Sequence, residues 1–283
     1  MSLVACKRGK QAIEFFLFTT NLPLALKAEQ AGVDGVIVDW EHRGKQARQK
    51  NHPLETNFDT PQDVYNLSSR LKIPVIVRVN PIGKHTDSEV KCAIHNGAKI
   101  IMLPMASDID EVIKFLKLVD KRTKTIIQIE TPSLANQAAN LVALDWDYAY
   151  IGLNDLMVAS GKRSIWQAII DGTAESICSH LRGRAYGFGG STILGGGEPI
   201  INLLILHELV RLGGTISVMR RTFKNELLDR DINIEMNALK KFVKCSERRG
   251  PHAIKQDHDH LLKIINNYLY PSLLNPLQRD DFC

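Results

Sequence analysis

Two carboxylates follow two apolar runs in the middle of the chain. Glu130 closes the run 125–129, and Asp155 lies just beyond the run 148–152. Both runs are short and rich in β-branched or aromatic residues, as buried strands are. The amphipathic segment 134–144 between them is long enough to be the crossover helix of a parallel strand–helix–strand unit. Both acids should therefore emerge at the C-terminal edge of one sheet, where a Mg²⁺ or Mn²⁺ ion with open coordination positions suits two carboxylates.

Two other strand ends carry polar side chains that could act on a substrate. Beyond Asp39 the chain delivers Glu41 and His42, a pair in which the histidine could act as general acid or base. The alternative is a histidine satisfied by a loop carbonyl. Arg78 stands inside an apolar run, where a guanidinium is costly unless it meets an anion such as the carboxylate of a 2-oxo acid. A structural ion pair between Arg78 and Asp39 or Glu130 is the alternative.

Strand-like runs and helical periodicity alternate from residue 12 to residue 220. The predicted strands are 14–19, 35–39, 74–80, 99–104, 125–129, 148–152, 184–187 and 215–220. The predicted helices are 22–31, 62–71, 88–96, 109–119, 133–144, 164–180 and 202–212. This order predicts a parallel (β/α)₈ TIM barrel. An open doubly wound sheet is the alternative, because one or two runs can be miscounted without a change in local pattern.

The alternation of predicted strands and helices ends at residue 220. The pattern there predicts helices at 225–244 and 260–268, joined by a polar loop at 246–259. We therefore assign residues 1–224 to the barrel domain and residues 225–283 to a C-terminal helical extension that packs on the barrel or on a neighbouring subunit. The loop contains histidines and aspartates at 256–260, for which we favour a solvated loop over a metal site.

Composition excludes several classes of protein. The 283 residues include 36 basic and 31 acidic side chains, and no basic stripe is interleaved with aromatic residues, which argues against a nucleic-acid partner. Five scattered cysteines without C-x-x-C spacing favour reduced thiols and a cytoplasmic protein. No apolar run approaches the ~18 to 20 residues of a membrane span, and the N-terminus lacks the pattern of a secretory signal.

Seven short motifs follow one another along the chain, at residues 32–34, 39–42, 74–78, 97–98, 102–105, 128–131 and 151–156. In this order they resemble the motifs of the HpcH/HpaI aldolase and citrate lyase β family, the metal-dependent class II pyruvate aldolases of the phosphoenolpyruvate/pyruvate barrel superfamily. Each motif is weak singly, but the set is specific and covers roughly residues 12 to 225.

The resemblance implies a role for each candidate residue. Glu130 and Asp155 look like the two metal ligands, and Arg78 like the group that binds the carboxylate and enolate oxygen of pyruvate. His42 is similar to the base that works through a metal-bound water. Further substrate contacts are implied at Gly152, Leu153 and Asn154.

The resemblance also implies partners. These are a pyruvate-like 2-oxo acid with an aldehyde or an acyl-CoA, and other copies of the chain in a homo-oligomer. Members of the family commonly form trimers or hexamers in which the last helices are exchanged.

Two features depart from the family pattern. His95 stands where many of these aldolases have an aspartate that partners the catalytic histidine. His95 could serve together with His42, the base role could have moved, or aldol activity could be lost. The segment 187–198 is richer in glycine than the usual loop. It could bring backbone N–H groups to a phosphate or carboxylate, form a mobile lid, or be a flexible loop.

Three functional hypotheses follow. The first is a divalent-metal-dependent carbon–carbon lyase that cleaves or forms 4-hydroxy-2-oxo acids through a pyruvate enolate. The second keeps the barrel and the metal but joins an acyl-CoA to a 2-oxo acid in a Claisen-type reaction, or reverses it. The third is a metal-binding barrel that has lost turnover.

Overall fold

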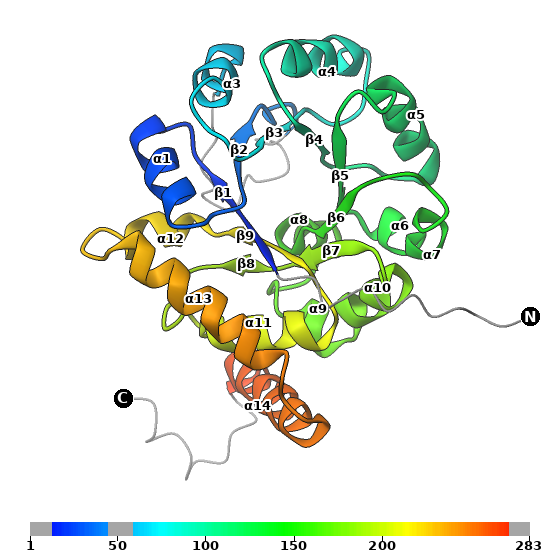
Figure 1. The fold of residues 1–283 in the computed structure, drawn as a ribbon. Coiled ribbons are helices and arrows are strands. Elements are labelled where there is room, and N and C mark those ends of the chain that lie inside the picture. Colours follow the sequence, from blue (N-terminus) through cyan, green and yellow to red (C-terminus); the bar gives the residue numbers. More distant parts are fainter. Residues whose placement is uncertain (1–12, 45–58, 272–283) are drawn as a thin grey trace, which may run out of the picture.

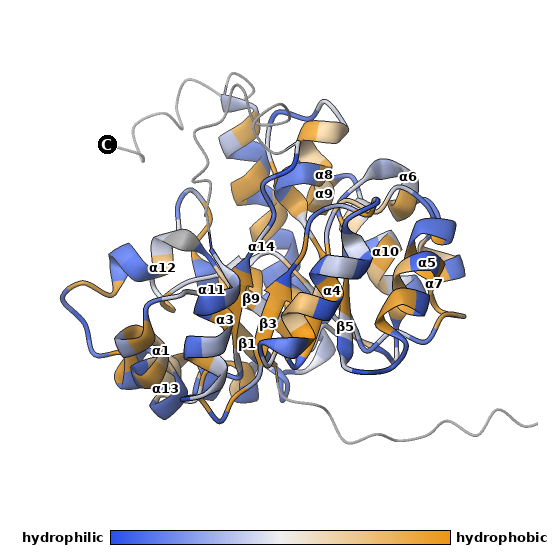
Figure 2. Cartoon of the chain, turned by 90° about the horizontal axis from the view of Figure 1, so that it is seen from above, coloured by the Kyte–Doolittle hydropathy of each residue, from blue (hydrophilic) through white to orange (hydrophobic). Residues whose placement is uncertain are grey.

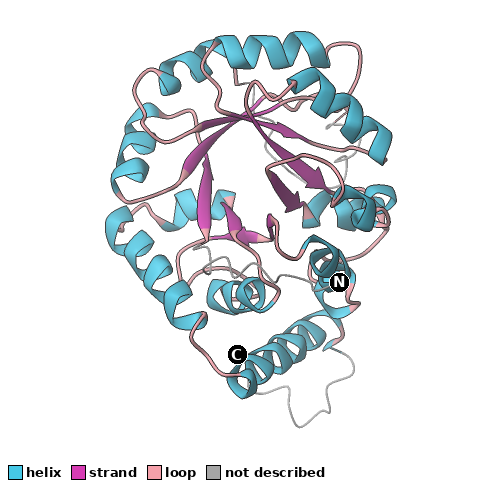
Figure 3. Cartoon of the chain, turned by 45° about the vertical axis from the view of Figure 1, so that its right-hand side comes forward, coloured by secondary structure: helices cyan, strands magenta, loops and turns pink. Residues whose placement is uncertain are grey.

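The computed structural model describes residues 13–44 and 59–271, in which parallel strands are enclosed by a ring of helices (Figures 1 and 3). All strands join one sheet in the order β7-β6-β5-β4-β3-β2-β1-β9-β8. Their bounds are β1 (Glu14–Phe18), β2 (Gly35–Asp39), β3 (Val75–Arg78), β4 (Ile100–Leu103), β5 (Lys124–Ile129), β6 (Tyr148–Ile151), β7 (Ala185–Phe188), β8 (Gly190–Ser191) and β9 (Ile216–Met219). Each strand lies within one residue of its predicted run or inside it, except β8.

The seventh predicted strand, 184–187, corresponds to β7, and the unpredicted short strand β8 that follows it helps to close the barrel. β7 pairs with β6, whereas β8 pairs with β9, and Gly189 with a φ of +66° turns the chain between them. β9 pairs in turn with β1, and the amide of Thr215 donates to the carbonyl of Tyr186 over 2.7 Å. β7 and β8 together therefore take the place of one barrel strand, so the nine strands fill the eight positions of the barrel. The predicted (β/α)₈ barrel is confirmed, and the open sheet is wrong.

Helices cover the outside of the barrel between successive strands. They are α1 (Leu22–Gln30), α3 (Pro61–Ser68), α4 (Thr86–His95), α5 (Ile109–Val119), α6 (Pro132–Ala135), α7 (Ala138–Leu141), α9 (Gln167–Ile170), α10 (Thr173–Leu181) and α11 (Asn202–Arg211). Side chains start several of them: Thr60 forms a capping box with Asp63, and Asp108 accepts the amide of Glu111 over 2.9 Å. The sequence pattern missed α8 (Leu153–Ala159) and α12 (Arg221–Glu226), because helices of two turns are too short to show a helical period.

The strands separate two apolar layers. Every second strand residue faces the lumen, where the side chains in contact are Phe16, Ile37, Ile76, Ile100, Met102, Ile126, Tyr148, Ile216 and Val218. The alternate residues pack outward against the helices in a larger core, and apolar residues accordingly dominate the strands in Figure 2. Two residues beyond the last of these apolar side chains on β2, β3 and β5, the residue that faces the lumen is polar. These residues are Asp39, Arg78 and Gln128.

The C-terminal helices differ from the prediction. α13 (Ile232–Ser246) and α14 (Pro251–Leu269) are separated by four residues, so the predicted loop at 246–259 is wrong. Pro251 opens α14 at a position where proline is favoured, and the sequence pattern was obscured by the polar residues on the exposed face of that helix. The boundary predicted at residue 224 falls within α12.

Both helices pack on the barrel's own outer helices. α13 lies against α1 and α11, and α14 lies against α11 and α9 (Figure 1). The acidic and histidine-rich run 256–260 is part of α14 and not a solvated loop. Asp257 pairs with Arg249, and Nδ1 of His258 lies 3.0 Å from Oε2 of the buried Glu208. These residues therefore dock α14 onto α11.

Two further observations concern the described part of the chain. Cys92, Cys178 and Cys245 are free thiols, as the sequence predicts for them. None of the helices within residues 13–44 and 59–271 combines the length and the apolar composition that a membrane crossing needs.

Candidate active site

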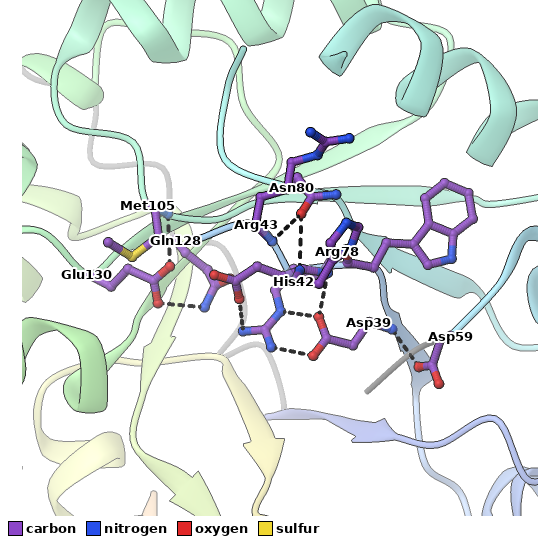
Figure 4. Close-up of polar contacts among 11 residues, drawn as sticks. Asp39, His42, Arg43, Asp59, Arg78, Asn80, Met105, Gln128 and Glu130 are labelled. Atoms are coloured by element: carbon purple, nitrogen blue, oxygen red, sulfur yellow. Dashed lines mark hydrogen bonds and ion pairs between the residues drawn. The ribbon is translucent and has the colours of Figure 1, made fainter. Parts of the chain in front are cut away.

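Polar side chains from β2, β3 and β5 meet at the C-terminal edge of the barrel (Figure 4). The register of the sheet places Asp39 opposite Arg78 on neighbouring strands. Glu130 follows β5 directly, and all three residues are buried. The sequence therefore brings these groups together at the edge where such barrels bind ligands.

Arg78 is held by two carboxylates. Its Nε and Nη2 donate to the two oxygens of Asp39 over 2.9 and 2.7 Å, and Nη1 lies 3.3 Å from Oε2 of Glu41. Burial lowers the pKa of the guanidinium, but the two carboxylates outweigh burial and raise it above its ordinary value. The ion pair with Asp39 that the sequence offered as an alternative is thus present. It orients the guanidinium without using all of its N–H donors.

Glu130 is a buried carboxylate held by two donors. Its Oε1 accepts the amide of Met105 over 2.9 Å, and its Oε2 accepts Nε2 of Gln128 over 3.0 Å. Met105 has a φ of +55°, a left-handed conformation that costs a non-glycine residue about 1 kcal/mol. The backbone at Met105 is therefore strained, and in this conformation the amide of Met105 points at the carboxylate of Glu130.

The charge of Asp155 acts on Glu130. Burial is the main cause that raises the pKa of Glu130 to about 8, and the charges of Asp155 and Glu41 add to it, while Arg78 opposes it. Asp155 is half-buried in the first turn of α8. The structure thus brings the two predicted metal ligands together.

The two carboxylates fit a divalent cation. Their mutual repulsion and the burial of Glu130 are both relieved when a hard cation binds, since oxygen ligands are what Mg²⁺ and Mn²⁺ prefer. Within the described ranges no group of three or more histidine, cysteine, aspartate or glutamate side chains could hold a metal ion. Two protein ligands would leave coordination positions for a substrate.

Gly152 lies directly against the Glu130 carboxylate. A Cβ at this position would be 2.4 Å from Oε2 of Glu130, although the φ of −83° suits an alanine. We expect Gly152→Ala to displace the carboxylate and to weaken Mn²⁺ binding about 10- to 100-fold, as changes beside metal ligands do. Calorimetric titration with Mn²⁺ measures this, with Gly250→Ala as the control because a Cβ there meets nothing within 4 Å. Unchanged affinity in Gly152→Ala would place the metal elsewhere.

His42 is positioned beside this group by its own loop. Its Nδ1 lies 2.9 Å from the carbonyl of Trp40, a contact in which Nδ1 carries the proton and Nε2 is left as the acceptor. The amides of His42 and Arg43 both donate to Oδ1 of Asn80, over 3.1 and 2.9 Å. The loop carbonyl foreseen as an alternative is therefore present, and it sets the ring in the tautomer of a general base.

His95 is not brought to His42 within one chain. It is the last residue of α4, which runs antiparallel to the strands, and it is exposed. Nearby, the amide of Lys99 donates to Val75, the first residue of β3. His95 therefore lies at the edge where the strands begin, whereas His42 follows the end of β2.

The implied substrate contacts lie in the turn between β6 and α8. Gly152 and Leu153 are buried and Asn154 is exposed. Sequence reasoning missed Asn80, Gln128 and Met105 as parts of the site. Alternation could have found two of them, because Asn80 lies two residues beyond Arg78 and Gln128 two before Glu130.

A pocket of about 590 Å³ opens elsewhere on the molecule. Its lining includes Val119, Thr125 and Asp147, which lie where β5 and β6 begin. It is therefore at the opposite edge of the barrel from Glu130, and it has no part in the site.

Comparisons with known proteins agree with this architecture. The model of a family described as HpcH/HpaI aldolase/citrate lyase matches residues 12–165 of the 283. Among solved structures, RipC from Yersinia pestis is 14% identical with a TM-score of 0.54, and the match covers 86% of this chain and 98% of RipC. The citrate synthase SbnG is 14% identical with a TM-score of 0.56, over 81% of this chain and 94% of SbnG. At this identity both structures show the fold alone. No curated protein matches the sequence.

Proposed function

The chain belongs to the HpcH/HpaI aldolase/citrate lyase family, and from this premise we propose that it is a metal-dependent lyase that cleaves or forms 4-hydroxy-2-oxo acids through a pyruvate enolate. One observation supports the proposal above all. Glu130, whose pKa is raised by burial and by the charge of Asp155, lies at the same barrel edge as the oriented guanidinium of Arg78. This combination suits a substrate that is both an anion and a metal chelator.

Glu130 and Asp155 are the residues that would hold Mg²⁺ or Mn²⁺. A cation bound there supplies positive charge to the keto oxygen, which makes an enolate easier to form. The amides of Met105 and Gln128 fix the Glu130 carboxylate before any ligand arrives, so little reorganisation is needed.

Arg78 would bind the substrate carboxylate. Asp39 and Glu41 hold the guanidinium in one orientation, and the N–H groups that they do not use remain for a second anion. The charge of the guanidinium also favours the enolate oxygen over the neutral keto oxygen.

His42 would move the proton. In the cleavage direction Nε2 of His42 accepts the proton of the 4-hydroxyl, the C3–C4 bond breaks, and its electrons form the enolate while the aldehyde leaves. The same proton can then be returned to C3 to give pyruvate. The contact between Nδ1 and the Trp40 carbonyl stabilises the ring in both states.

Pyruvate release tests the proposal. The purified protein is incubated with 4-hydroxy-2-oxo acids before and after treatment with EDTA, and again after Mn²⁺ or Mg²⁺ is restored. We expect pyruvate release that stops when EDTA is added and returns when the metal is restored. The variant Asp155→Asn should release no pyruvate. Turnover that survives complete metal removal would overturn the proposal. Pyruvate binding without any product would favour the non-catalytic barrel.

A Claisen-type reaction between an acyl-CoA and a 2-oxo acid is the second candidate. The position of His95 is the observation that brings it in, because the exposed His95 does not join His42 within one chain as the aldolase pattern implies. An assay of thiol release with acetyl-CoA and oxaloacetate separates the two candidates. The cytoplasmic location and the trimeric or hexameric assembly stay predictions.

A further inference from the structure

Arg220 lies at the same edge of the barrel as the candidate site. Ile216 and Val218 of β9 face the lumen, and Arg220 continues this alternation two residues later, just beyond the strand. It is the residue from which α12 begins. The arginine is partly exposed, and its side chain extends beneath the glycine-rich segment that follows β8.

The guanidinium of Arg220 presents a binding edge that the described residues leave unused. Its Nε and Nη2 atoms are buried and have no hydrogen-bond partner among residues 13–44 and 59–271. Arg78 uses these same two atoms to bind both oxygens of Asp39. Buried donors are nearly always paired, and a charged donor without a partner costs free energy. The unused edge of Arg220 therefore has the geometry of a bidentate carboxylate or phosphate site.

The charge of Glu226 acts on Arg220, but the carboxylate of Glu226 is hydrogen-bonded to another residue. Burial lowers the pKa of Arg220, and the charges of Glu226 and Tyr150 oppose that effect. The Oε2 atom of Glu226 accepts the hydroxyl of Thr192 over 2.6 Å. Among the described contacts no hydrogen bond or ion pair joins Glu226 to Arg220, so Glu226 contributes long-range attraction without occupying the binding edge.

Glycines make the close approach to Arg220 possible. A Cβ on Gly190 would lie 2.3 Å from Cγ of Arg220, and one on Gly197 would lie 2.4 Å from its Nη2. The glycines of this segment therefore let the backbone cover the guanidinium. The backbone that lies against Nη2 is that of Gly197, which follows two more glycines, so no side chain stands between this part of the guanidinium and an anion that shifts the backbone.

Tyr150 connects Arg220 to the candidate metal ligands. Burial raises the pKa of its hydroxyl, the charge of Glu130 adds to this, and the charges of Arg220 and Arg78 oppose it. The hydroxyl donates to the carbonyl of Gly189, where the chain turns into the glycine-rich segment. Both arginines and Glu130 therefore lie within electrostatic reach of one side chain at this edge of the barrel.

We propose that Arg220 and the glycine-rich segment form a second anion subsite of the active site, which binds a distal carboxylate or phosphate of the substrate. This inference rests on the proposed function, in which Arg78 binds the first carboxylate. The preferred substrate is then a 2-oxo acid that carries another anionic group at its far end.

Matched ligands test the subsite. 2-Oxoglutarate and 2-oxoadipate have the same number of carbon atoms as 2-oxopentanoate and 2-oxohexanoate, with a carboxylate in place of the terminal methyl group. With Mn²⁺ present, we expect at least one diacid to bind the unaltered protein about 10-fold or more tightly than its monoacid. In Arg220→Gln this preference should vanish while monoacid affinity stays the same. Equal loss for both ligands would overturn the proposal, whereas no loss would exclude a carboxylate as the anion and leave the decision to phosphate.

Inorganic phosphate tests the other source of the anion without a metal. In EDTA, we expect phosphate to raise the melting temperature of the unaltered protein but not that of Arg220→Gln. An Arg220-dependent shift with phosphate and none with a diacid would assign the subsite to a phosphorylated substrate. If neither ligand shows dependence on Arg220, the subsite does not exist.

Controls separate the possible failures. Arg70→Gln removes one exposed positive charge at the other edge of the barrel and should leave all affinities unchanged. Arg220→Lys keeps the charge but not the fork, so it should recover only part of the preference. If monoacids fail to bind the unaltered protein with Mn²⁺, the proposed function fails, while the phosphate measurement still decides the role of Arg220.

Discussion

Replacing Glu130 by glutamine is expected to reduce metal-dependent turnover by a factor on the order of a thousand or more. Glutamine keeps the shape of the side chain, and its oxygen can still accept the amide of Met105. What is lost is the negative charge that would hold the cation beside Asp155. Initial rates of pyruvate release and Mn²⁺ titrations of the same samples measure both effects.

The pH dependence of metal binding gives the same experiment a second readout. Because the pKa of Glu130 is raised to about 8, the metal-free protein binds a proton there at neutral pH, and Mn²⁺ must displace it. Affinity should therefore rise up to about tenfold per pH unit below pH 8 and level off above it. Glu130→Gln should lose this slope.

Stability without metal should follow the opposite course. The folded protein holds the Glu130 proton more tightly than the unfolded chain, in which this glutamate has its ordinary pKa of 4.5. The contribution of Glu130 to the free energy of unfolding is therefore complete below about pH 4.5, and it is lost as the pH rises towards 8. Urea unfolding in EDTA should show this loss in the unaltered protein and in the exposed control Asp110→Asn, but not in Glu130→Gln. Full turnover in Glu130→Gln would contradict the assignment of Glu130 as a ligand.

Replacing Arg78 by leucine is expected to impair both stability and turnover. The change removes the buried guanidinium that neutralises Asp39 and Glu41, which costs about 3 to 5 kcal/mol of unfolding free energy. Turnover should fall by a factor on the order of a hundred to a thousand, because the bound carboxylate and the developing enolate lose their counter-charge. Urea unfolding and pyruvate-release rates measure the two effects separately.

Two companion variants distinguish a structural arginine from one that binds the substrate. Arg78→Lys keeps the charge and should recover stability while turnover stays low, since an ammonium cannot reproduce the oriented fork. The double variant Arg78→Leu/Asp39→Asn removes both members of the bidentate pair and should recover part of the stability without turnover. If the double variant regains turnover, Arg78 serves only to pair with Asp39.

The strands and the main helices could be predicted from the sequence because their signals are local. The apolar runs of β2, β3 and β5 and the helical periodicity of α5 are patterns of residues that are close together in the chain. Parallel strands then bring Arg78, Glu130 and Asp155 to one edge, so the choice of candidate residues also followed from the sequence. The short α8 and α12 and the start of α14 were missed, because their apolar signals are weak or interrupted by polar residues.

The sequence by itself determined a parallel barrel whose acidic and basic side chains emerge at one edge. The reason is that each strand and each main helix leaves its pattern in residues that are neighbours in the chain, and so does the order in which strands and helices follow one another. Only the tertiary structure decided which of these groups meet. Asp39 pairs with Arg78, and the backbone amide of Met105 donates to Glu130. His95 lies at the opposite edge of the barrel from His42, and the Nε and Nη2 atoms of Arg220 have no hydrogen-bond partner among the described residues. The physical reason is distance along the chain. Each of these contacts joins residues from different strands or loops, or depends on the absence of a partner, and no local pattern records which side chains will face one another after folding.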